Sequence, residues 1–407
     1  MRFSSRTGWL RTPNPLAALL NSRREKGIQI FDLTLSNPTR ANFRYLDPKL
    51  LKPFFDTQNL VYDPDPHGLL QARQALCDFY GKKGIRISPE EIFLTASTSE
   101  AYGFVFRLLL DPHETVLAPQ PSYPLLDYLA GLNDIRIVRY PLHHLTHVRK
   151  DRVQHGGWYL ELEELESRRE PAPRAVLLVH PNNPTGNYVA EKERAKINEI
   201  VLRDKMTVLC DEVFFDFVLD KKIQRPRSFA GQREVLTFTL SGISKILGLP
   251  QMKIAWILVS GPEKEKEEAI QKLEVIADTY LSAGTPSQRA LRAWFDMWST
   301  IHGEISNRLK DNLAYLTEKF KAAVNVRLLM PEGGWYVMLE VPPIRTDEEW
   351  SLLLLEKDDV LIHPGYLFDA EEENLLVLSL LPDPVRFQES IDRLIRRFQE
   401  TMDVPQV

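Results

Sequence analysis

The feature that most constrains the fold is a series of short apolar runs between residues 91 and 260, most of them separated by helical stretches. Strands that are apolar throughout and alternate with helices are typical of a mainly parallel sheet with helices on both faces. The sequence therefore predicts a large α/β domain built on a seven-stranded sheet. The expected strands are 91–96, 115–119, 135–142, 175–181, 206–215, 235–240 and 253–260, and the expected helices around them are 69–80, 99–110, 122–131, 190–204 and 262–281.

The two ends of the chain have a different pattern, which predicts a second, smaller α+β domain. A short amphipathic helix is expected at 13–26, opened by prolines and ended by Gly27. We expect this N-terminal segment to pack against the C-terminal part, so that 45–285 form the large domain and 1–44 with 286–407 the small one. In the C-terminal part, the sequence predicts a long helical segment at 287–321, four strand-like stretches, and helices near 347–357 and 384–402.

Charge and composition exclude several classes of partner. The 407 residues carry a formal charge of −5 with acids and bases interspersed, so neither nucleic acid nor an anionic membrane is an expected partner. No apolar stretch is long enough for a signal peptide or a bilayer span. Cys77 and Cys210 both lie in apolar contexts, which indicates reduced thiols and no disulfide framework. We expect a cytoplasmic protein.

Four histidines gather in a polar insertion at 142–158, namely His143, His144, His147 and His155. No carboxylate or cysteine pattern nearby completes a set of metal ligands. We therefore interpret the insertion as a surface loop and expect no metal site.

Lys245 stands in a small polar turn between two of the apolar runs, with Ser244 before it and Gly248 and Pro250 after it. Desolvation disfavours an ammonium and lowers its pKa, so a lysine held between two buried strands can react as a neutral amine. Such an amine forms a Schiff base with a carbonyl compound. The alternative is a solvated loop lysine, and the residues at the other strand ends decide between the two.

Ligands of a doubly wound sheet gather at the carboxyl ends of its strands. Ser97 and Thr98 follow the first expected strand and open a helix, where hydroxyls and free N–H groups make a phosphate site. Simple capping of the helix is the alternative. Tyr123 follows the second strand in a proline-rich turn, where its ring can stack on a flat ligand or pack at a helix start.

Two more polar residues follow later strands. Asn183 lies in the turn HPNNPTG and has an amide able to donate to a ligand oxygen. Asp211 ends a buried run, where its carboxylate needs a cation or several donors, and a protonated ring nitrogen meets that need. Taken with Lys245, Tyr123 and the helix start at Ser97, these groups match pyridoxal 5′-phosphate (PLP), an aromatic aldehyde with a phosphate, a phenolic oxygen and a pyridine nitrogen.

The spacing of four motifs resembles the class I/II aminotransferases, which are fold-type I PLP-dependent enzymes. The likeness covers nearly the whole chain and implies the PLP-dependent transferase fold type I. It also implies that Lys245 is the catalytic Schiff-base lysine and that Asp211 is the partner of the pyridinium nitrogen. The motifs are NNPTG (182–186), DEVFF (211–215), SKILGLP (244–250) and HPGYLF (363–368).

The resemblance assigns the remaining cofactor contacts as well. It implies that Asn183 bonds the phenolic oxygen and that Tyr123 stacks on the ring. Tyr62 is similar to the tyrosine that reaches the phosphate of the neighbouring subunit, which implies a homodimer with active sites at the interface. For the phosphate end, the matching residues of the protomer itself are Ser97, Thr98, Ser244 and Lys253.

Several positions depart from the family pattern. Lys253 stands where an arginine usually contacts the phosphate, and Gly242 occupies a position that is more often serine. Phe214 replaces a tyrosine that shares the phenolic oxygen with the asparagine. Val377 stands where an arginine usually holds the α-carboxylate of the substrate, while Arg40 is a candidate to enter the site from the N-terminal segment.

The sequence thus predicts a PLP-dependent aminotransferase that moves an amino group from an amino donor to a keto acid. A PLP-dependent lyase, cyclase or other elimination enzyme is the alternative, because this fold alone does not fix the reaction and Val377 adds weight to it. A non-catalytic cofactor-binding or regulatory module is a third hypothesis. The intact set of Lys245, Asp211 and Asn183 argues against it.

Overall fold

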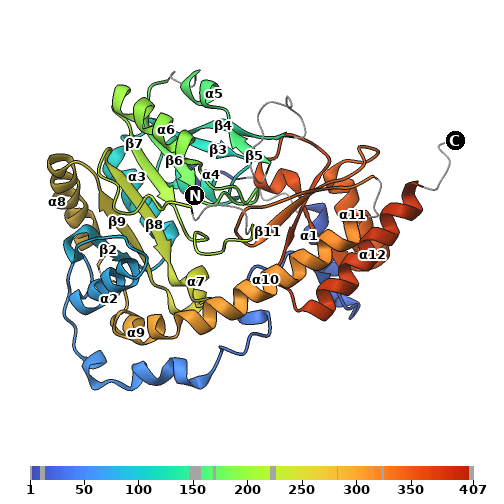
Figure 1. The fold of residues 1–407 in the computed structure, drawn as a ribbon, viewed down its shortest axis with the longest axis horizontal. Helices are drawn as coiled ribbons and strands as arrows, with labels where there is room; N and C mark the ends of the chain where they lie inside the picture. The colour runs from blue at the N-terminus through green and yellow to red at the C-terminus, as the bar shows by residue number, and fades with distance from the viewer. Residues whose placement is uncertain are drawn as a thin grey trace.

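The computed structural model describes residues 2–9, 14–145, 157–167, 171–220, 226–281, 283–321 and 325–402. Over these residues the chain forms one large mixed sheet, a smaller antiparallel sheet and a two-stranded parallel pair (Figure 1). The large sheet has the order β2-β9-β8-β7-β6-β3-β4-β5, with β2, β9 and β5 joined by antiparallel pairing and the rest parallel. Its strands are β2 (Ile92–Thr95), β3 (Thr115–Gln120), β4 (Arg136–His144), β5 (Trp158–Leu160), β6 (Pro173–Val179), β7 (Thr207–Asp211), β8 (Thr237–Gly242) and β9 (Ala255–Ser260).

Seven of these strands lie at the predicted places, and the α/β fold class is confirmed. The interpretation of 142–158 as a surface loop was wrong at both ends, because His143 and His144 belong to β4 and pair with Tyr159 and Trp158 of β5. The added strand has only three residues, too few to show a pattern in the sequence. His147 and His155 lie outside the described residues.

Helices cover both faces of the large sheet, because successive residues of its buried strands point to opposite sides. Phe93 and Ile257 pack with α3 and α8 on one face, while Leu94 and Trp256 pack with α2 and α9 on the other. The covering helices are α2 (Leu70–Gly81), α3 (Thr98–Leu109), α4 (Leu126–Leu132), α5 (Leu162–Ser167), α6 (Glu191–Arg203), α8 (Glu263–Tyr280) and α9 (Thr285–Asp296).

The predicted long helix at 287–321 is two helices, α9 and α10 (Trp298–Phe320). The chain tightens between them, where Met297 N–H donates to the Trp294 carbonyl three residues earlier. This break lets α9 pack on α2 while α10 runs on to the smaller sheet and packs against α12 (Figure 1). Helical periodicity predicts the helical content but not the break.

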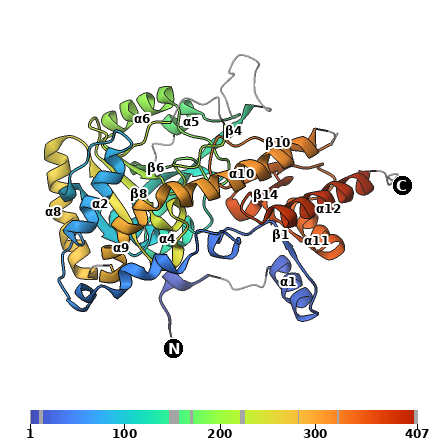
Figure 2. The ribbon, with the colours of Figure 1, turned by 60° about the horizontal axis from the view of Figure 1, so that its bottom comes forward.

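The smaller sheet, in the order β10-β11-β14-β13, carries helices of its own. As predicted, the N-terminal helix α1 (Pro15–Glu25) returns to this part of the molecule, where Leu16 packs with Leu355 and Leu361 (Figure 2). The division at 44–45 and 285–286 stays a prediction. The elements here are β1 (Phe31–Asp32), which pairs with β12 (Val360–Leu361), β10 (Arg327–Leu329), β11 (Tyr336–Glu340), β13 (His363–Pro364), β14 (Leu375–Ser379), α11 (Asp347–Asp358) and α12 (Pro384–Met402).

In the described part of the chain, no helix combines the length and apolar character needed to cross a membrane. No group of three or more His, Cys, Asp and Glu side chains placed to hold a metal ion occurs there either. Cys77 and Cys210 are unpaired.

Candidate active site

Lys245 lies on the short helix α7 (Ile243–Ile246), which begins directly after β8. Its Nζ donates to the Ser36 carbonyl oxygen at 3.4 Å and lies 4.8 Å from the ring centroid of Trp335 and 5.4 Å from that of Phe214. Burial lowers the pKa of Lys245 to about 8, while the Asp211 charge opposes this shift. The amine is therefore neutral over a much wider pH range than a surface lysine.

We expect the reactivity of Lys245 to rise with pH and to reach half its maximum near pH 8, because only the neutral amine attacks a carbonyl. A free lysine amine in water reaches the same point only near pH ~10.4. The measurement is labelling of cofactor-free protein with an aldehyde and borohydride, followed by peptide mass spectrometry. A pH midpoint for the Lys245 peptide equal to that of a free lysine amine would contradict the lowered pKa.

Asp211 is the last residue of β7 and is only 6% exposed. Its carboxylate accepts hydrogen bonds from the Tyr102 hydroxyl at 2.9 Å and from the Val213 N–H at 3.0 Å. Burial raises the pKa of Asp211 to about 6, and these two hydrogen bonds together with the Lys245 charge act in the opposite direction. A buried carboxylate with two neutral donors still gains from a cation, so the site fits a protonated ring nitrogen.

Asn183 lies in the turn after β6 and is 8% exposed. Its Oδ1 is buried without a hydrogen-bond partner in the described part of the protein. The neighbouring Asn182 fastens this turn, because its Nδ2 donates to the Pro121 carbonyl at 3.0 Å and to Thr185 Oγ1 at 2.8 Å. Pro121 is two residues from Tyr123, so the Asn183 and Tyr123 turns are held side by side.

Tyr123 connects this group to the start of α3. Its hydroxyl hydrogen-bonds with the Ser99 side chain, and its pKa is raised to about 12, first by burial and second by the nearby Asp211 charge. Ser97 is the N-cap of α3 and accepts a hydrogen bond from the Glu100 N–H at 3.2 Å, so it does cap the helix. Ser97 and Thr98 thus stand at a helix N-terminus close to Tyr123 and Asp211, where N–H groups favour an anion.

Two predicted site residues are exposed at the surface of the protomer. Lys253 is exposed in a left-handed conformation, with φ 52°, and forms no ion pair with any residue the structure describes. Tyr62 is 68% exposed in the loop after the short helix Thr57–Leu60. Ser244 precedes Lys245 on α7 and is partly buried.

The departures from the family pattern fall in well-defined surroundings. Val377 is fully buried in β14, where it pairs with Met338 and His363. Arg40 is exposed in the short helix Pro38–Arg40. The Phe214 ring lies near Lys245 and Trp335. The site therefore has an apolar ring at the position where the family pattern has a tyrosine hydroxyl.

Gly242 has a steric reason to lack a side chain. A Cβ at this position would lie 2.9 Å from the Cβ of Ala255 on the paired strand β9. We expect Gly242→Ser to lower the free energy of unfolding by about 1–3 kcal/mol, the usual cost of overpacking. Urea unfolding measures it, and Gly242→Ser combined with Ala255→Gly should recover part of the loss. An unchanged stability of the single variant would show that the strands separate freely.

Three contacts of the site were not predicted from the sequence: Tyr102 on Asp211, the Ser36 carbonyl on Lys245, and the Trp335 ring over Lys245. Tyr102 lies within an apolar stretch of α3 and carries no motif. Ser36 acts through its backbone, which no sequence pattern reports. The Trp335 ring approaches Lys245 Nζ to 4.8 Å through tertiary packing, which the local sequence does not report.

Comparison with known proteins decides the family. The family model described as aminotransferase class I and II matches residues 48–388. The chain belongs to this family. It is an aminotransferase, as predicted. It is 24% identical over 379 residues to a glutamate-pyruvate aminotransferase of Haemophilus influenzae, with 91% of each chain covered. It is 25% identical over 380 residues to an alanine aminotransferase of Mycobacterium tuberculosis, covering 91% of this chain and 85% of that one.

Solved structures confirm the fold. An aminotransferase from Escherichia coli superposes with a TM-score of 0.85 at 22% identity, covering 100% of both chains. An alanine aminotransferase from Pyrococcus furiosus superposes with a TM-score of 0.85 at 23% identity, covering 98% of this chain and 100% of that one. These likenesses establish the fold-type I architecture of this aminotransferase.

Proposed function

We propose that this aminotransferase works with PLP held between Lys245 and Asp211. The observation that carries the proposal is a partly buried amine with a pKa lowered to about 8 beside a buried carboxylate with a pKa raised to about 6, at the carboxyl ends of neighbouring strands. Each group lacks a close ionic partner of its own among the described residues. An aromatic aldehyde with a ring nitrogen supplies one partner to each of them.

The residues present fit the rest of this cofactor. In our proposal the Nδ2 of Asn183 donates a hydrogen bond to the phenolic oxygen, and Tyr123, which lies near Asp211, stacks on the ring. The start of α3 at Ser97 and Thr98 receives the phosphate, as helix N-termini do for anions generally. Ser244 and Lys253 contribute further phosphate contacts, with Lys253 supplying charge without the fork geometry of arginine.

PLP, when bound, supplies an electron sink for the bonds at the substrate Cα. The chain's own residues do the rest. Lys245 Nζ would hold the cofactor by its carbonyl group, and the same amine would move a proton at the substrate Cα as general base and acid. Asp211 keeps the ring nitrogen protonated, and the Tyr102 hydroxyl holds the carboxylate in position. Phe214 and Trp335 exclude water on the side of Lys245.

The reaction moves an amino group from an amino donor to a keto acid, and the relatives named above are glutamate-pyruvate and alanine aminotransferases. A screen of amino donors tests this, with the absorbance of the bound cofactor as the readout. We expect a subset of donors to convert the cofactor to its amine form, and a keto acid to reverse the change. Release of ammonia without that conversion would favour the lyase or elimination alternative, which the comparisons do not favour.

We also propose that the protein is a homodimer in which Tyr62 reaches the phosphate of the neighbouring site. The support is the exposed apolar surface of this segment, where Phe55 is 84% and Leu60 is 88% exposed. Mixing Lys245→Ala and Tyr62→Ala protomers should restore activity above the sum of the two alone, because each mixed dimer has one complete site. A monomer with full activity would contradict the proposal.

We propose a cytoplasmic location and no nucleic-acid or membrane partner. The support is the pair of unpaired thiols, Cys77 and Cys210, and the negative net charge of −5 with interspersed signs.

A further inference from the structure

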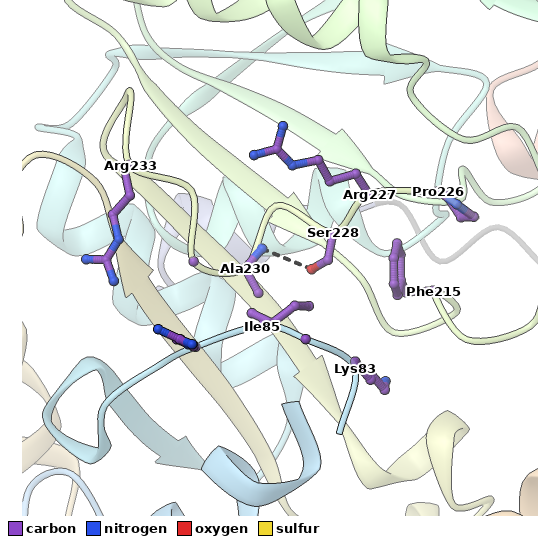
Figure 3. A pocket seen from close by; sticks show the side chains of 11 residues that line it. Lys83, Ile85, Phe215, Pro226, Arg227, Ser228, Ala230 and Arg233 are labelled. Carbon is purple, nitrogen blue, oxygen red and sulfur yellow. Dashed lines mark hydrogen bonds between the residues drawn. The ribbon is translucent and has the colours of Figure 1, made fainter. Parts of the chain in front are cut away.

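A cavity of about 570 Å³ lies between the loop that follows α2 and the loop that leads into β8 (Figure 3). One wall is the stretch 83–86 and the other is 226–233. The chain as a whole carries −5, yet four cationic side chains line this cavity, and no Asp or Glu is among the described residues that do so. The cations are Lys83, Arg86, Arg227 and Arg233.

Two of the arginines have only distant ionic partners. Arg227 Nη1 lies 3.8 Å from Glu191, and both of these side chains are about two-thirds exposed. Arg233 Nη1 lies 3.7 Å from Glu91, a carboxylate that Lys266 holds more closely at 2.8 Å. The Arg227 pair is long and exposed and contributes little, and the buried Glu91 already has a closer partner in Lys266 than in the half-exposed Arg233. Both guanidinium groups are therefore available to an anion.

The other two cations differ from each other. Lys83 Nζ bonds both oxygens of Asp216 at 2.6 and 2.7 Å and lies 3.9 Å from the Phe79 ring centroid, so it serves the structure. Arg86 is exposed, and no ion pair joins it to any residue within the described ranges. The charges free to bind are thus the three guanidinium groups, whose planar forks suit carboxylate and phosphate.

The floor of the cavity is apolar. Ile85 lies between the cationic side chains, and Phe215 and Pro226 close one end (Figure 3). The two loops approach closely at Gly231, where a Cβ would lie 3.3 Å from the Ile85 side chain. An occupant therefore meets guanidinium groups on its sides and apolar atoms beneath it.

This cavity is separate from the site around Lys245, since no residue that contacts Lys245 lines it. One wall of the cavity is nevertheless hydrogen-bonded to the carboxyl end of β7, where Asp211 lies. Glu212, the neighbour of Asp211, accepts hydrogen bonds from Ser228 Oγ and from the Phe229 N–H, each at 2.6 Å.

We propose that this cavity binds a small organic polyanion, with two or more phosphate or carboxylate charges attached to a flat apolar body. The three free guanidinium groups select the charges, and Ile85, Phe215 and Pro226 select the body. The limited volume of about 570 Å³ and the negative net charge of the chain favour a small molecule over nucleic acid.

The test is isothermal titration of the full chain, first saturated with PLP so that its phosphate site is filled. ADP probes the phosphate source, benzene-1,2,4-tricarboxylate probes the carboxylate source, and pyrophosphate lacks the flat body. We expect ADP or the tricarboxylate to bind more tightly than pyrophosphate, and the affinity to fall as salt is raised. The triple variant Arg86→Gln/Arg227→Gln/Arg233→Gln should weaken binding by about 100-fold or more, since each charged hydrogen bond contributes about tenfold.

The matched control is Arg24→Gln/Lys264→Gln/Arg396→Gln, which removes the same charge from exposed side chains elsewhere. It should bind the probe within about threefold of the natural chain, a difference of well under 1.4 kcal/mol. The proposal is overturned if no probe binds, or if both triple variants lose affinity equally. Thermal unfolding checks that both variants fold. A chain that fails to retain PLP would refute the proposed function, while the comparison of the two triple variants would still test the cavity.

Discussion

Lys245→Ala should abolish transamination, lowering kcat/KM by at least about 10³-fold, because both a covalent step and a proton transfer depend on this one amine. The fold should survive the change. The site holds the Lys245 ammonium under two aromatic rings, where burial lowers its pKa to about 8. Removing the buried ammonium removes its unfavourable desolvation free energy, so the melting temperature should stay the same or rise. The rise should be clearest in Lys245→Met, which keeps most of the side-chain volume.

Two measurements separate this role from a structural one. Borohydride reduction and peptide mass spectrometry should find the cofactor attached to the peptide of Lys245 in the natural chain and absent from it in both variants. Lys264→Ala, which removes an exposed lysine, is the matched control and should keep both activity and attachment. An unchanged visible absorbance of the bound cofactor in Lys245→Ala would refute the assignment.

The sequence predicts the architecture well where burial is continuous. Six strands of the large sheet are buried over nearly their whole length because helices cover both faces, and this leaves a clear apolar pattern. β5 escapes prediction because three residues at a sheet edge are too short for any periodicity. The break between α9 and α10 escapes it because a turn at Met297 depends on how each helix packs.

For the site, the sequence indicates which side chains at strand ends lie close together, while their roles stay predictions. The structure brings Asp211, Asn183, Tyr123 and the start of α3 together, as their positions after parallel strands suggest. The sequence does not indicate contacts that depend on tertiary packing or on the backbone, such as the Tyr102 hydroxyl on Asp211. For Lys253 and Tyr62, the protomer places both at its surface, so their roles depend on the cofactor and on a second subunit.

The departures from the family pattern acquire physical reasons of different kinds. Glycine is required at position 242 because Ala255 on β9 leaves no room for a Cβ there. Val377 is set by its surroundings, because it is packed among apolar side chains such as Met338 and Phe368. An arginine introduced there would bury a charge without a partner in that cluster. The apolar surroundings of Val377 are therefore a property of the whole cluster and not of this one position.

Asp211→Asn should lower kcat/KM by about 10²–10⁴-fold, the range that a group controlling proton position contributes. Asparagine keeps the size of the side chain but loses the charge that in our proposal holds a proton on the ring nitrogen. The variant should also lower the pKa of Lys245, because the Asp211 charge raises it in the natural chain. The pH midpoint of aldehyde labelling of Lys245 should accordingly move below about 8. A merely structural role for Asp211 predicts no such movement.

Tyr102→Phe is the matched control for this prediction. It removes the 2.9 Å hydrogen bond to Asp211 but leaves the carboxylate and its charge in place. A hydrogen bond to a charged group contributes about 1.5–3 kcal/mol, so kcat/KM should fall by about 10- to 100-fold, at or below the low end of the loss expected for Asp211→Asn. Without this donor the pKa of Asp211 should rise further, because the Tyr102 hydrogen bond lowers it. If Tyr102→Phe were as damaging as Asp211→Asn, then orientation of the carboxylate, and not its charge, would be what the reaction requires.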